Sequence, residues 1–153
     1  MKHFSLERIV NCLKVKIATT NDEYNDALLV RRQVFIEEQQ VSEVEEIDNL
    51  ENEATHFVLY DHNQPIGAGR FRQLENTGKV ERICVLSTSR KKGSGKMIMD
   101  KIEQYAIDQG INKLKLNSQT HAEQFYKKLG YETVSEVFMD AGIPHVTMVK
   151  QLT

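Results

Sequence analysis

The sequence predicts an α/β (α+β) fold with one mixed β-sheet of about seven strands, flanked by about four helices. The first observation is length, since 153 residues with 40 % apolar and 27 % charged side chains are typical of one globular domain. The second is periodicity, because short alternating segments are interspersed with amphipathic segments of helical spacing. The third is order: three strand-like segments follow one another within residues 55–86, and a β-α-β unit comes later. A meander combined with such a unit predicts both antiparallel and parallel pairs.

The N-terminal part of the chain predicts a short extension before the domain. Residues 1–13 are weakly amphipathic and lack the continuous apolar core and small-residue cleavage site of a signal peptide. A single domain is expected over residues 14–153. It starts with a strand, because the segment KVKIATT alternates and carries β-branched residues.

The segment after this strand predicts a long amphipathic helix. Asn21 or Asp22 can cap it, and its apolar face continues to about Glu38. Arg31 falls in the middle of that face, and Glu38 falls on it too. Because burying an unpaired charge is costly, both side chains are expected to be paired or to line a cleft.

Strands and helices alternate in the rest of the chain. Residues 41–54 are predicted as a loop with about one helical turn. Strands are predicted over 55–62, 66–74, 79–86, 113–116, 131–139 and 145–152, and helices over 95–109 and 121–129. Gly110 and Gly130 are well placed to end these two helices.

The charged side chains are segregated along the chain. The net charge is −2, yet residues 37–53 hold eight acids and no base, and residues 79–101 hold seven bases and two acids. The near-zero net charge argues against a nucleic-acid binder driven by bulk charge, and no apolar run approaches the ~20 residues of a membrane span. We therefore expect neither nucleic acid nor membrane as a partner, but an acidic and a basic patch at different sites.

The two cysteines, Cys12 and Cys84, lie in different contexts without a CxxC spacing. This usage is typical of reduced thiols in a cytoplasmic protein, and it offers no zinc ligand set. Cys84 is most simply explained as a small buried side chain, because a cysteine nucleophile needs a nearby cationic base.

The most informative segment covers residues 90–96, where a basic, glycine-containing loop follows a strand and opens a helix. A helix N-terminus presents free N–H groups and a positive dipole end, and Gly93 and Gly95 let this backbone approach a ligand closely. With its basic side chains the loop predicts an anion site suited to phosphate. It matches neither the Walker A nor the dinucleotide-binding pattern, and a solvated basic turn is the alternative.

Two patterns resemble the coenzyme A motifs of the GNAT acetyltransferase superfamily. They are Val85-x4-Arg90-x-x-Gly93-x-Gly95 and Gln119-x-x-Ala122-x-x-Phe125-Tyr126-x-x-x-Gly130-Tyr131. The predicted element order is similar as well, so the resemblance covers residues 14–152. Further segments resemble the ElaA/YjcF-like branch of small bacterial N-acetyltransferases: Arg31-x-x-Val34-Phe35-x-x-Glu38-Gln39, Glu46-Ile47-Asp48 and Gly142-Ile143-Pro144-His145.

The resemblance implies an N-acetyltransferase that moves the acetyl group of acetyl-CoA to an amine of a small molecule or peptide, in a ternary complex and without a metal. The sheet would splay beside the strand that ends at Leu86, and acetyl-CoA would lie in that cleft. A non-catalytic module that binds or senses CoA is the alternative, and the dimers common among small relatives leave a homodimer open. The residues implied in cofactor binding are the main chain of Ile83, Cys84 and Val85, the pyrophosphate loop Arg90, Lys91, Lys92, Gly93, Ser94, Gly95 and Lys96, and Asn117, Gln119, Phe125 and Tyr126 at the cleft edge.

Two residues are catalytic candidates by the same resemblance. Tyr126 matches the position whose hydroxyl protonates the departing thiolate, and core packing is its alternative role. Glu81 lies near the place where a carboxylate takes the amine proton through water, and a solvent-facing strand glutamate is the alternative.

Four residues are candidates for the acceptor site. Arg31 and Glu38 would lie at or beneath it, with a structural ion pair as the alternative. Asp48 and the acids around it could attract a cationic amine, although most such charges form a solvated face. His145 has a side chain suited to act as a base, and a structural histidine is the alternative. His121 is expected to start a helix.

Overall fold

The computed structural model describes residues 12–152 of the chain. Its helices are α2 (Asn21–Arg31), η1 (Arg32–Glu38), α3 (Glu43–Glu46), η2 (Glu51–Glu53), η3 (Ser87–Ser89), α4 (Ser94–Asp108), η4 (Thr120–Ala122) and α5 (Glu123–Lys128). Its strands are β1 (Leu13–Ile17), β2 (Thr55–Asp61), β3 (Gln64–Leu74), β4 (Thr77–Val85), β5 (Lys113–Gln119), β6 (Glu132–Thr133), β7 (Phe138–Asp140) and β8 (Ile143–Gln151). The predicted extension lies outside the described residues except for its last two, Cys12 and Leu13, and Leu13 already belongs to β1.

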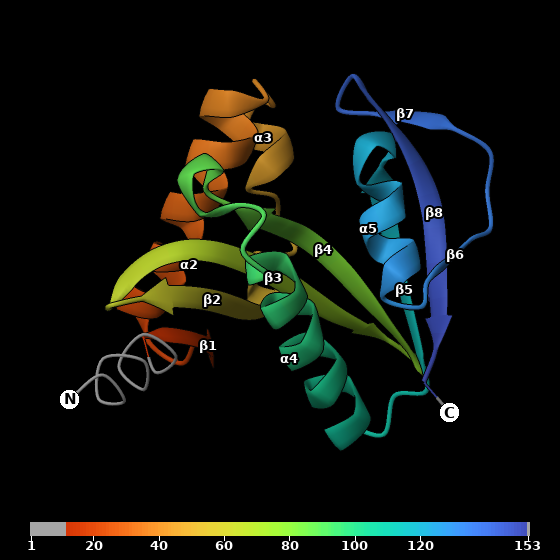
Figure 1. Ribbon diagram of the computed structural model, residues 1–153, viewed down its shortest axis with the longest axis horizontal. Coiled ribbons are helices and arrows are strands. Elements are labelled where there is room, and N and C mark those ends of the chain that lie inside the picture. Colours follow the sequence, from red (N-terminus) through yellow and green to blue (C-terminus); the bar gives the residue numbers. More distant parts are fainter. Residues whose placement is uncertain (1–11, 153) are drawn as a thin grey trace.

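One mixed sheet runs through the described part of the chain and confirms the predicted fold class (Figure 1). Its strands lie in the order β1-β2-β3-β4-β5-β8-β6, and β7 pairs with β8 as well. The β4–β5 pair is parallel, and the other pairs are antiparallel. Residues 12–152 form eight strands rather than about seven, because the predicted strand 131–139 is broken into β6 and β7. At the break the hydroxyl of Ser135 accepts the hydrogen bond of the Thr147 N–H at 2.8 Å, in place of a strand carbonyl.

The first long helix differs from its prediction at both ends. Thr20, rather than Asn21 or Asp22, is the N-cap, and its hydroxyl accepts a hydrogen bond from a backbone N–H of the first turn. The α-helical part ends at Arg31, and η1 continues it as a π-helix to Glu38. A π-helix takes more residues per turn than an α-helix, so the two side chains do not share the face that regular spacing predicts. Arg31 is fully buried, whereas Glu38 is exposed.

Helices cover both faces of the sheet, with α4 in front of β2–β4 and α2 behind them in Figure 1. The core under α4 includes Phe57, Leu59, Ile98, Ile102 and Leu114, and the smaller core under α2 includes Ala27, Val30, Val34, Ala68 and Cys84. The close approach of α4 requires Gly67 in β3, because a Cβ at this position would lie 2.8 Å from Cδ1 of Ile98. Larger side chains there would push α4 away from the sheet.

The C-terminal strands bring distant residues to one edge. β5 runs beyond the predicted 113–116 to Gln119, because its last residues stay paired with β8. Gln119 pairs with His145 in this ladder. The β7–β8 hairpin closes through Ala141 and Gly142, which have φ values of 51° and 74°, as a two-residue turn requires.

Candidate active site

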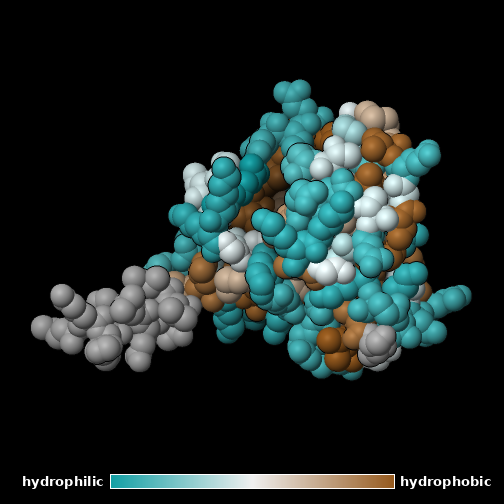
Figure 2. All heavy atoms as spheres, turned by 45° about the vertical axis from the view of Figure 1, so that its right-hand side comes forward, coloured by the Kyte–Doolittle hydropathy of each residue, from teal (hydrophilic) through white to brown (hydrophobic). Residues whose placement is uncertain are grey.

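The sheet splays between β4 and β5. The two strands pair from Thr77 to Val80 on β4 and from Lys113 to Leu116 on β5, and no ladder joins their later residues. Beyond this point β4 stays paired with β3 and β5 with β8. A cleft of about 600 Å³ opens between the two halves of the sheet. Figure 2 shows a hollow in this surface, with hydrophobic atoms inside and hydrophilic side chains around it.

A β-bulge shapes the β4 wall of the cleft. Arg82 and Ile83 both lie opposite Gly69 of β3, and Arg82 has a φ of 58°. Because of the extra residue, Glu81 and Cys84 lie on the same face of the sheet, opposite Arg70 and Ala68, and both line the cleft. Cys84 is also buried against the α2 core. Burial raises the pKa of the Cys84 thiol, which therefore stays protonated and fits its predicted packing role. The bulge had no signal in the sequence pattern of β4.

The cleft brings most of the predicted site residues together. Those that line it are Glu38, Glu81, Ile83, Cys84, Val85, Arg90, Gly95, Asn117, Gln119, Phe125, Tyr126 and His145. Predicted residues outside its lining are Arg31, Asp48, Lys91, Lys92, Gly93, Ser94 and Lys96. Lining residues that the sequence reasoning did not assign to the site include Gln39, Lys79, Arg82, His121 and Asp140.

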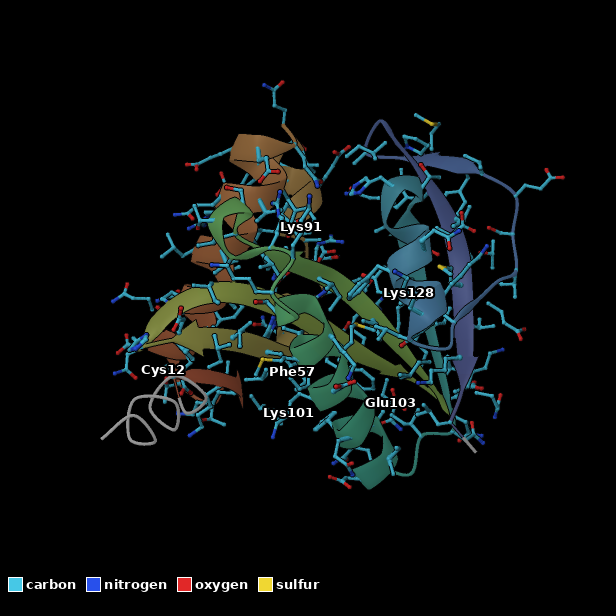
Figure 3. The ribbon with its side chains drawn as sticks, viewed as in Figure 1. Cys12, Phe57, Lys91, Lys101, Glu103 and Lys128 are labelled. Carbon is cyan, nitrogen blue, oxygen red and sulfur yellow. The ribbon has the colours of Figure 1, made fainter. Side chains whose placement is uncertain are left out.

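The loop before α4 has features that suit an anion site. Gly93 is the N-cap of α4 with a φ of 80°, and a Cβ there would meet no atom within 4 Å. Ser94 is buried, and its hydroxyl donates to the carbonyl of Ser89, which ties the loop to the helix start. The first N–H groups of α4 lack partners inside the helix. Lys91, in the loop above α4 in Figure 3, also has a positive φ of 64°.

Arg90 holds two walls together. Its Nε donates to the carbonyl of Val85 at 2.8 Å, and its two terminal nitrogens donate to the carboxylate of Glu38 at 2.6 and 2.7 Å. The hydrogen bond from Arg90 lowers the pKa of Glu38, so this carboxylate is ionised at neutral pH. The Arg90 guanidinium is thus committed within the protein, which leaves the backbone N–H that the resemblance assigns to the pyrophosphate. Glu38 likewise acts as a partner of Arg90 at the cleft edge.

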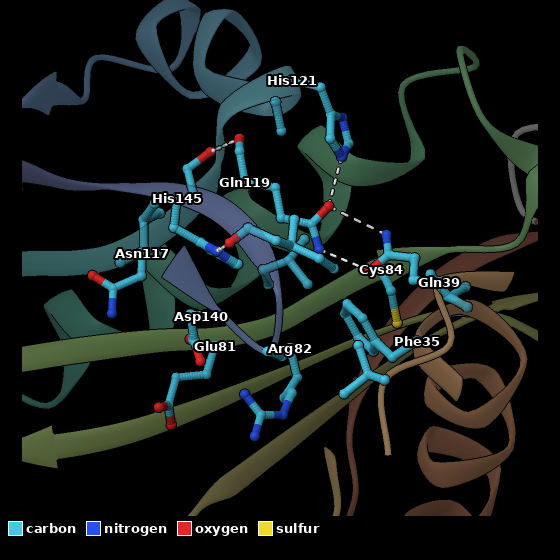
Figure 4. A pocket seen from close by; sticks show the side chains of 18 of the residues that line it. Phe35, Gln39, Glu81, Arg82, Cys84, Asn117, Gln119, His121, Asp140 and His145 are labelled. Carbon is cyan, nitrogen blue, oxygen red and sulfur yellow. Dashed lines mark hydrogen bonds between the residues drawn. The ribbon is translucent and has the colours of Figure 1, made fainter. Parts of the chain in front are cut away.

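A second bridge crosses the cleft at its outer end. Gln39, which follows η1, and Gln119, which ends β5, exchange amide hydrogen bonds of 3.3 and 2.7 Å (Figure 4). Nε2 of His121 lies 2.6 Å from the amide oxygen of Gln119. His121 does start the predicted helix region, in η4, but it also reaches the cleft. Gln39 ends one of the segments that resemble the ElaA/YjcF-like branch. This resemblance was the signal in the sequence that could have identified Gln39 as a site residue.

Tyr126 lies on the α5 wall with its ring in the core. The residue is 8 % exposed and packs edge-to-face against Phe125 and Tyr131. Burial raises the pKa of the Tyr126 hydroxyl, which is therefore protonated at neutral pH. Within the described residues the hydroxyl makes no hydrogen bond, so it can donate one to a ligand in the cleft.

An ion-pair network, here called the arginine network, lies beneath the β4 wall. It joins four arginines to four acids: Arg31, Arg70, Arg72 and Arg82, with Glu46, Asp48, Glu51 and Glu81. Arg31 donates to Glu46 and to Glu51 at 2.7 Å and has no exposed surface. Arg31 is therefore corrected from an acceptor-site residue to a structural one, because a fully buried side chain cannot meet a substrate.

Asp48 is corrected in the same way. Its carboxylate binds Arg70 at 2.8 Å and Arg82 at 3.3 Å, and it does not line the cleft. Burial raises its pKa, but the hydrogen bond from Arg70 and the neighbouring charges outweigh burial and lower it. The acids of residues 37–53 that lie in this network are thus neutralised by arginines distant in sequence. They do not form the free acidic patch that their clustering predicted.

Glu81 faces the cleft but is held by the arginine network. Its oxygens accept hydrogen bonds from Arg72 at 2.7 and 3.2 Å and one from Arg70 at 3.1 Å. Burial raises the pKa of Glu81, and these arginines outweigh burial and lower it. A carboxylate in this state is ionised but weakly basic.

We expect acid to weaken the fold through this network. The lowered pKa values of Asp48, Glu51 and Glu81 mean that their contribution to stability is complete above the ordinary carboxyl range and is lost as pH falls below it. Glu46 acts with the opposite sign, because burial raises its pKa. The urea midpoint should fall between about pH 6 and about pH 3, and Arg72→Met, which removes one of the two arginine partners of Glu81, should flatten that fall. An equal fall in both proteins would contradict the assignment.

Within residues 12–152 no three His, Cys, Asp or Glu side chains are grouped so that they could hold a metal ion. No helix in this part of the chain is long and apolar enough to cross a membrane.

Comparison with known proteins identifies the family. The acetyltransferase (GNAT) domain model matches residues 17–152. The uncharacterized N-acetyltransferase YjcF of Bacillus subtilis (strain 168) is 50 % identical over 139 residues, which cover 90 % of this chain and 99 % of that protein. The crystal structure of Escherichia coli ElaA matches with a TM-score of 0.80 at 20 % identity, over 90 % of this chain and 99 % of ElaA. An aminoglycoside 6′-N-acetyltransferase complexed with coenzyme A shares the fold at a TM-score of 0.72 and 18 % identity, over 92 % and 97 % of the two chains. The chain therefore belongs to the GNAT acetyltransferase family, in its ElaA/YjcF-like branch.

Proposed function

We propose that the protein transfers the acetyl group of acetyl-CoA to the amine of a small molecule or peptide by direct attack in a ternary complex. The observation that carries the proposal is the cleft between β4 and β5, with the unpartnered N-terminus of α4 at one end. Strand edges without a ladder partner and free helix N–H groups suit a ligand that combines an amide-containing arm with phosphates.

The residues present fit coenzyme A. On one side, the main chain of Cys84 and Val85 pairs with β3, and Ile83 belongs to the bulge. On the cleft side, these three residues have no strand partner. It would bind the amide groups of the pantetheine arm as a further strand does. The N–H groups of the loop around Gly93 would hold the pyrophosphate, and the side chains of Lys91 and Lys92 would add positive charge. Asn117, Gln119 and Phe125 would line the arm from the opposite wall.

Acetyl-CoA would supply the activated acyl group, and the chain's own residues would position it and move protons. Tyr126 would donate its hydroxyl proton to the leaving sulfur, since this hydroxyl is protonated and has no internal partner. Glu81 was expected to take the amine proton through water. Its two arginine partners weaken it for that task, although its charge still attracts an ammonium group.

Tyr126→Phe is expected to lower thiol release from acetyl-CoA in the presence of amine by about 10-fold or more. This loss lies near the lower end of the rate effects that general acid catalysis produces, because a thiolate can leave without full protonation. The ring and its packing remain, so acetyl-CoA affinity measured by calorimetry should not change. Thiol release is followed with a chromogenic disulfide.

Tyr131→Phe is the matched control, since the Tyr131 hydroxyl is buried without a partner among residues 12–152 and Tyr131 does not line the cleft. Its rate should equal that of the wild type. If the wild type binds acetyl-CoA but releases no thiol with any amine tested, and Tyr126→Phe changes nothing, the protein is a non-catalytic CoA-binding module. If acetyl-CoA does not bind, the proposed function is wrong.

A further inference from the structure

His145 is held in one orientation at the cleft wall. It stands near the start of β8, opposite Gln119 at the end of β5, and its ring stacks on Phe138 with centroids 6.0 Å apart and planes at 23°. Nδ1 lies 2.7 Å from the carbonyl oxygen of Ile143. A carbonyl oxygen only accepts hydrogen bonds, so Nδ1 must carry the proton. The neutral ring then presents a lone pair on Nε2.

The other ring nitrogen is uncommitted. His145 is 9 % exposed, and Nε2 has no hydrogen-bond partner among the described residues. Only His56 Nδ1 and the Tyr131 hydroxyl are fully enclosed side-chain atoms without a partner in residues 12–152, so Nε2 of His145 is not fully enclosed. His145 also lines the cleft. His145 thus has an acceptor nitrogen without a partner among residues 12–152, on a side chain that lines the cleft (Figure 4).

The two carboxylates of the cleft that the sequence analysis singled out are already bound. Glu81 is held by two arginines, and Glu38 is paired with Arg90. Nε2 of His121 is 2.6 Å from the amide oxygen of Gln119 and therefore donates to it. The charged or titratable side chains that line the cleft on the elements around His145 are Lys79, Glu81, Arg82 and Cys84 on β4, His121 on η4, Tyr126 on α5 and Asp140 on β7.

We propose that Nε2 of His145, rather than Glu81, is the general base that deprotonates the acceptor amine. The proposal rests on the proposed acetyl transfer. It also narrows the acceptor to amines that are protonated when they bind, such as primary alkylamines, because an already neutral aryl amine needs no such base. The carbonyl of Ile143 acts as the orienting partner, as the third group does in other catalytic arrangements.

The protons and bonds balance in this scheme. Nε2 of His145 takes one proton from the ammonium group and later passes it to solvent. The freed nitrogen lone pair forms the C–N bond while the C–S bond of the thioester breaks, and Tyr126 donates a proton to the sulfur. The second proton lost from nitrogen restores the Tyr126 hydroxyl. One ammonium and one thioester thus give one amide, one thiol and one released proton.

His145→Asn tests the proposal, because an asparagine amide N–H can still donate to Ile143 while the Nε2 acceptor is gone. His62→Asn is the matched control at an exposed hairpin histidine outside the cleft. Activity is assayed with tyramine, spermidine, glucosamine and a lysine-containing peptide. For whichever amine reacts best, kcat/KM should fall about 10²- to 10⁴-fold in His145→Asn, with acetyl-CoA affinity unchanged. Below the pKa of the amine, kcat/KM should also fall more steeply with falling pH in His145→Asn than in the wild type, because the variant can use only amine that is already neutral.

Two further readouts separate this proposal from the proposed function. Nitrogen-15 NMR of the free protein should find His145 protonated at Nδ1 and bare at Nε2, and the opposite tautomer would overturn the proposal. If no amine of the panel reacts, the slow hydrolysis of bound acetyl-CoA replaces the assay, since the same base would activate water. Equal rates in His145→Asn and wild type would overturn the role of His145 and leave acetyl transfer standing. Failure of the wild type to bind acetyl-CoA would overturn both.

Discussion

Arg31→Met is expected to lower the free energy of unfolding by about 3–5 kcal/mol, a large part of the stability of a domain this size. Arg31 has no exposed surface and contacts both Glu46 and Glu51, which are themselves buried. Methionine fills much of the volume but leaves these carboxylates with fewer cationic partners in a site that water does not reach. Urea unfolding followed by circular dichroism measures the loss.

Arg32→Met is the matched control, because the adjacent arginine makes a 3.3 Å ion pair with Glu43 at the surface, where both side chains are about half exposed or more. Its effect should stay within about 0.5 kcal/mol. If Arg31→Met does not fold, Arg31→Lys provides the comparison, since lysine keeps the charge but cannot form the forked hydrogen bonds. Equal stabilities for the variants at 31 and 32 would show that the arginine network does not stabilise the fold.

Gly93→Glu is expected to weaken acetyl-CoA binding by more than about 100-fold, or about 2.7 kcal/mol. Nothing lies within 4 Å of a Cβ at this position, so the new carboxylate would project into the space before the N-terminus of α4. There it would compete with the pyrophosphate for the same N–H groups and repel its charge. Isothermal titration calorimetry with acetyl-CoA measures the change.

Gly110→Glu controls for backbone strain. Gly110 follows the other end of α4, has a φ of 77° against 80° for Gly93, and also has no atom within 4 Å of a Cβ. The two substitutions should therefore cost similar stability, while Gly110→Glu should bind acetyl-CoA as the wild type does. If Gly93→Glu binds normally, the loop does not hold the phosphates.

Local features of the site could be predicted from the sequence, whereas features that depend on tertiary pairing could not. The basic glycine loop before α4 was predicted because Gly93, Gly95 and a helix start are neighbours in the chain. The bulge at Arg82 was missed, since a bulge is defined by the partner strand as much as by its own residues. The same holds for the π-helical turn that separates Arg31 from Glu38.

The segregated charges are a second feature whose outcome depends on tertiary pairing and could not be predicted from the sequence. Clustering of acids over residues 37–53 predicted an acidic surface near a cationic acceptor. In the structure Glu46, Asp48 and Glu51 meet Arg31, Arg70 and Arg82, which come from α2, β3 and β4. One-dimensional charge counts could not predict this neutralisation, because it depends on which strands are adjacent. The loop of the basic segment and the helix that follows it are neighbours in the chain, so the sequence could place this loop at a helix start.

An amide-resolved NMR titration with coenzyme A tests the proposed binding mode most directly, because it reports binding and location together. We expect saturable shifts at the amides of residues 83–85 and 90–96 and at Gln119 and Phe125 on the opposite wall, with no shifts of comparable size along β1 or β2. Absence of shifts, or shifts confined to residues outside the cleft between β4 and β5, would contradict the proposed site.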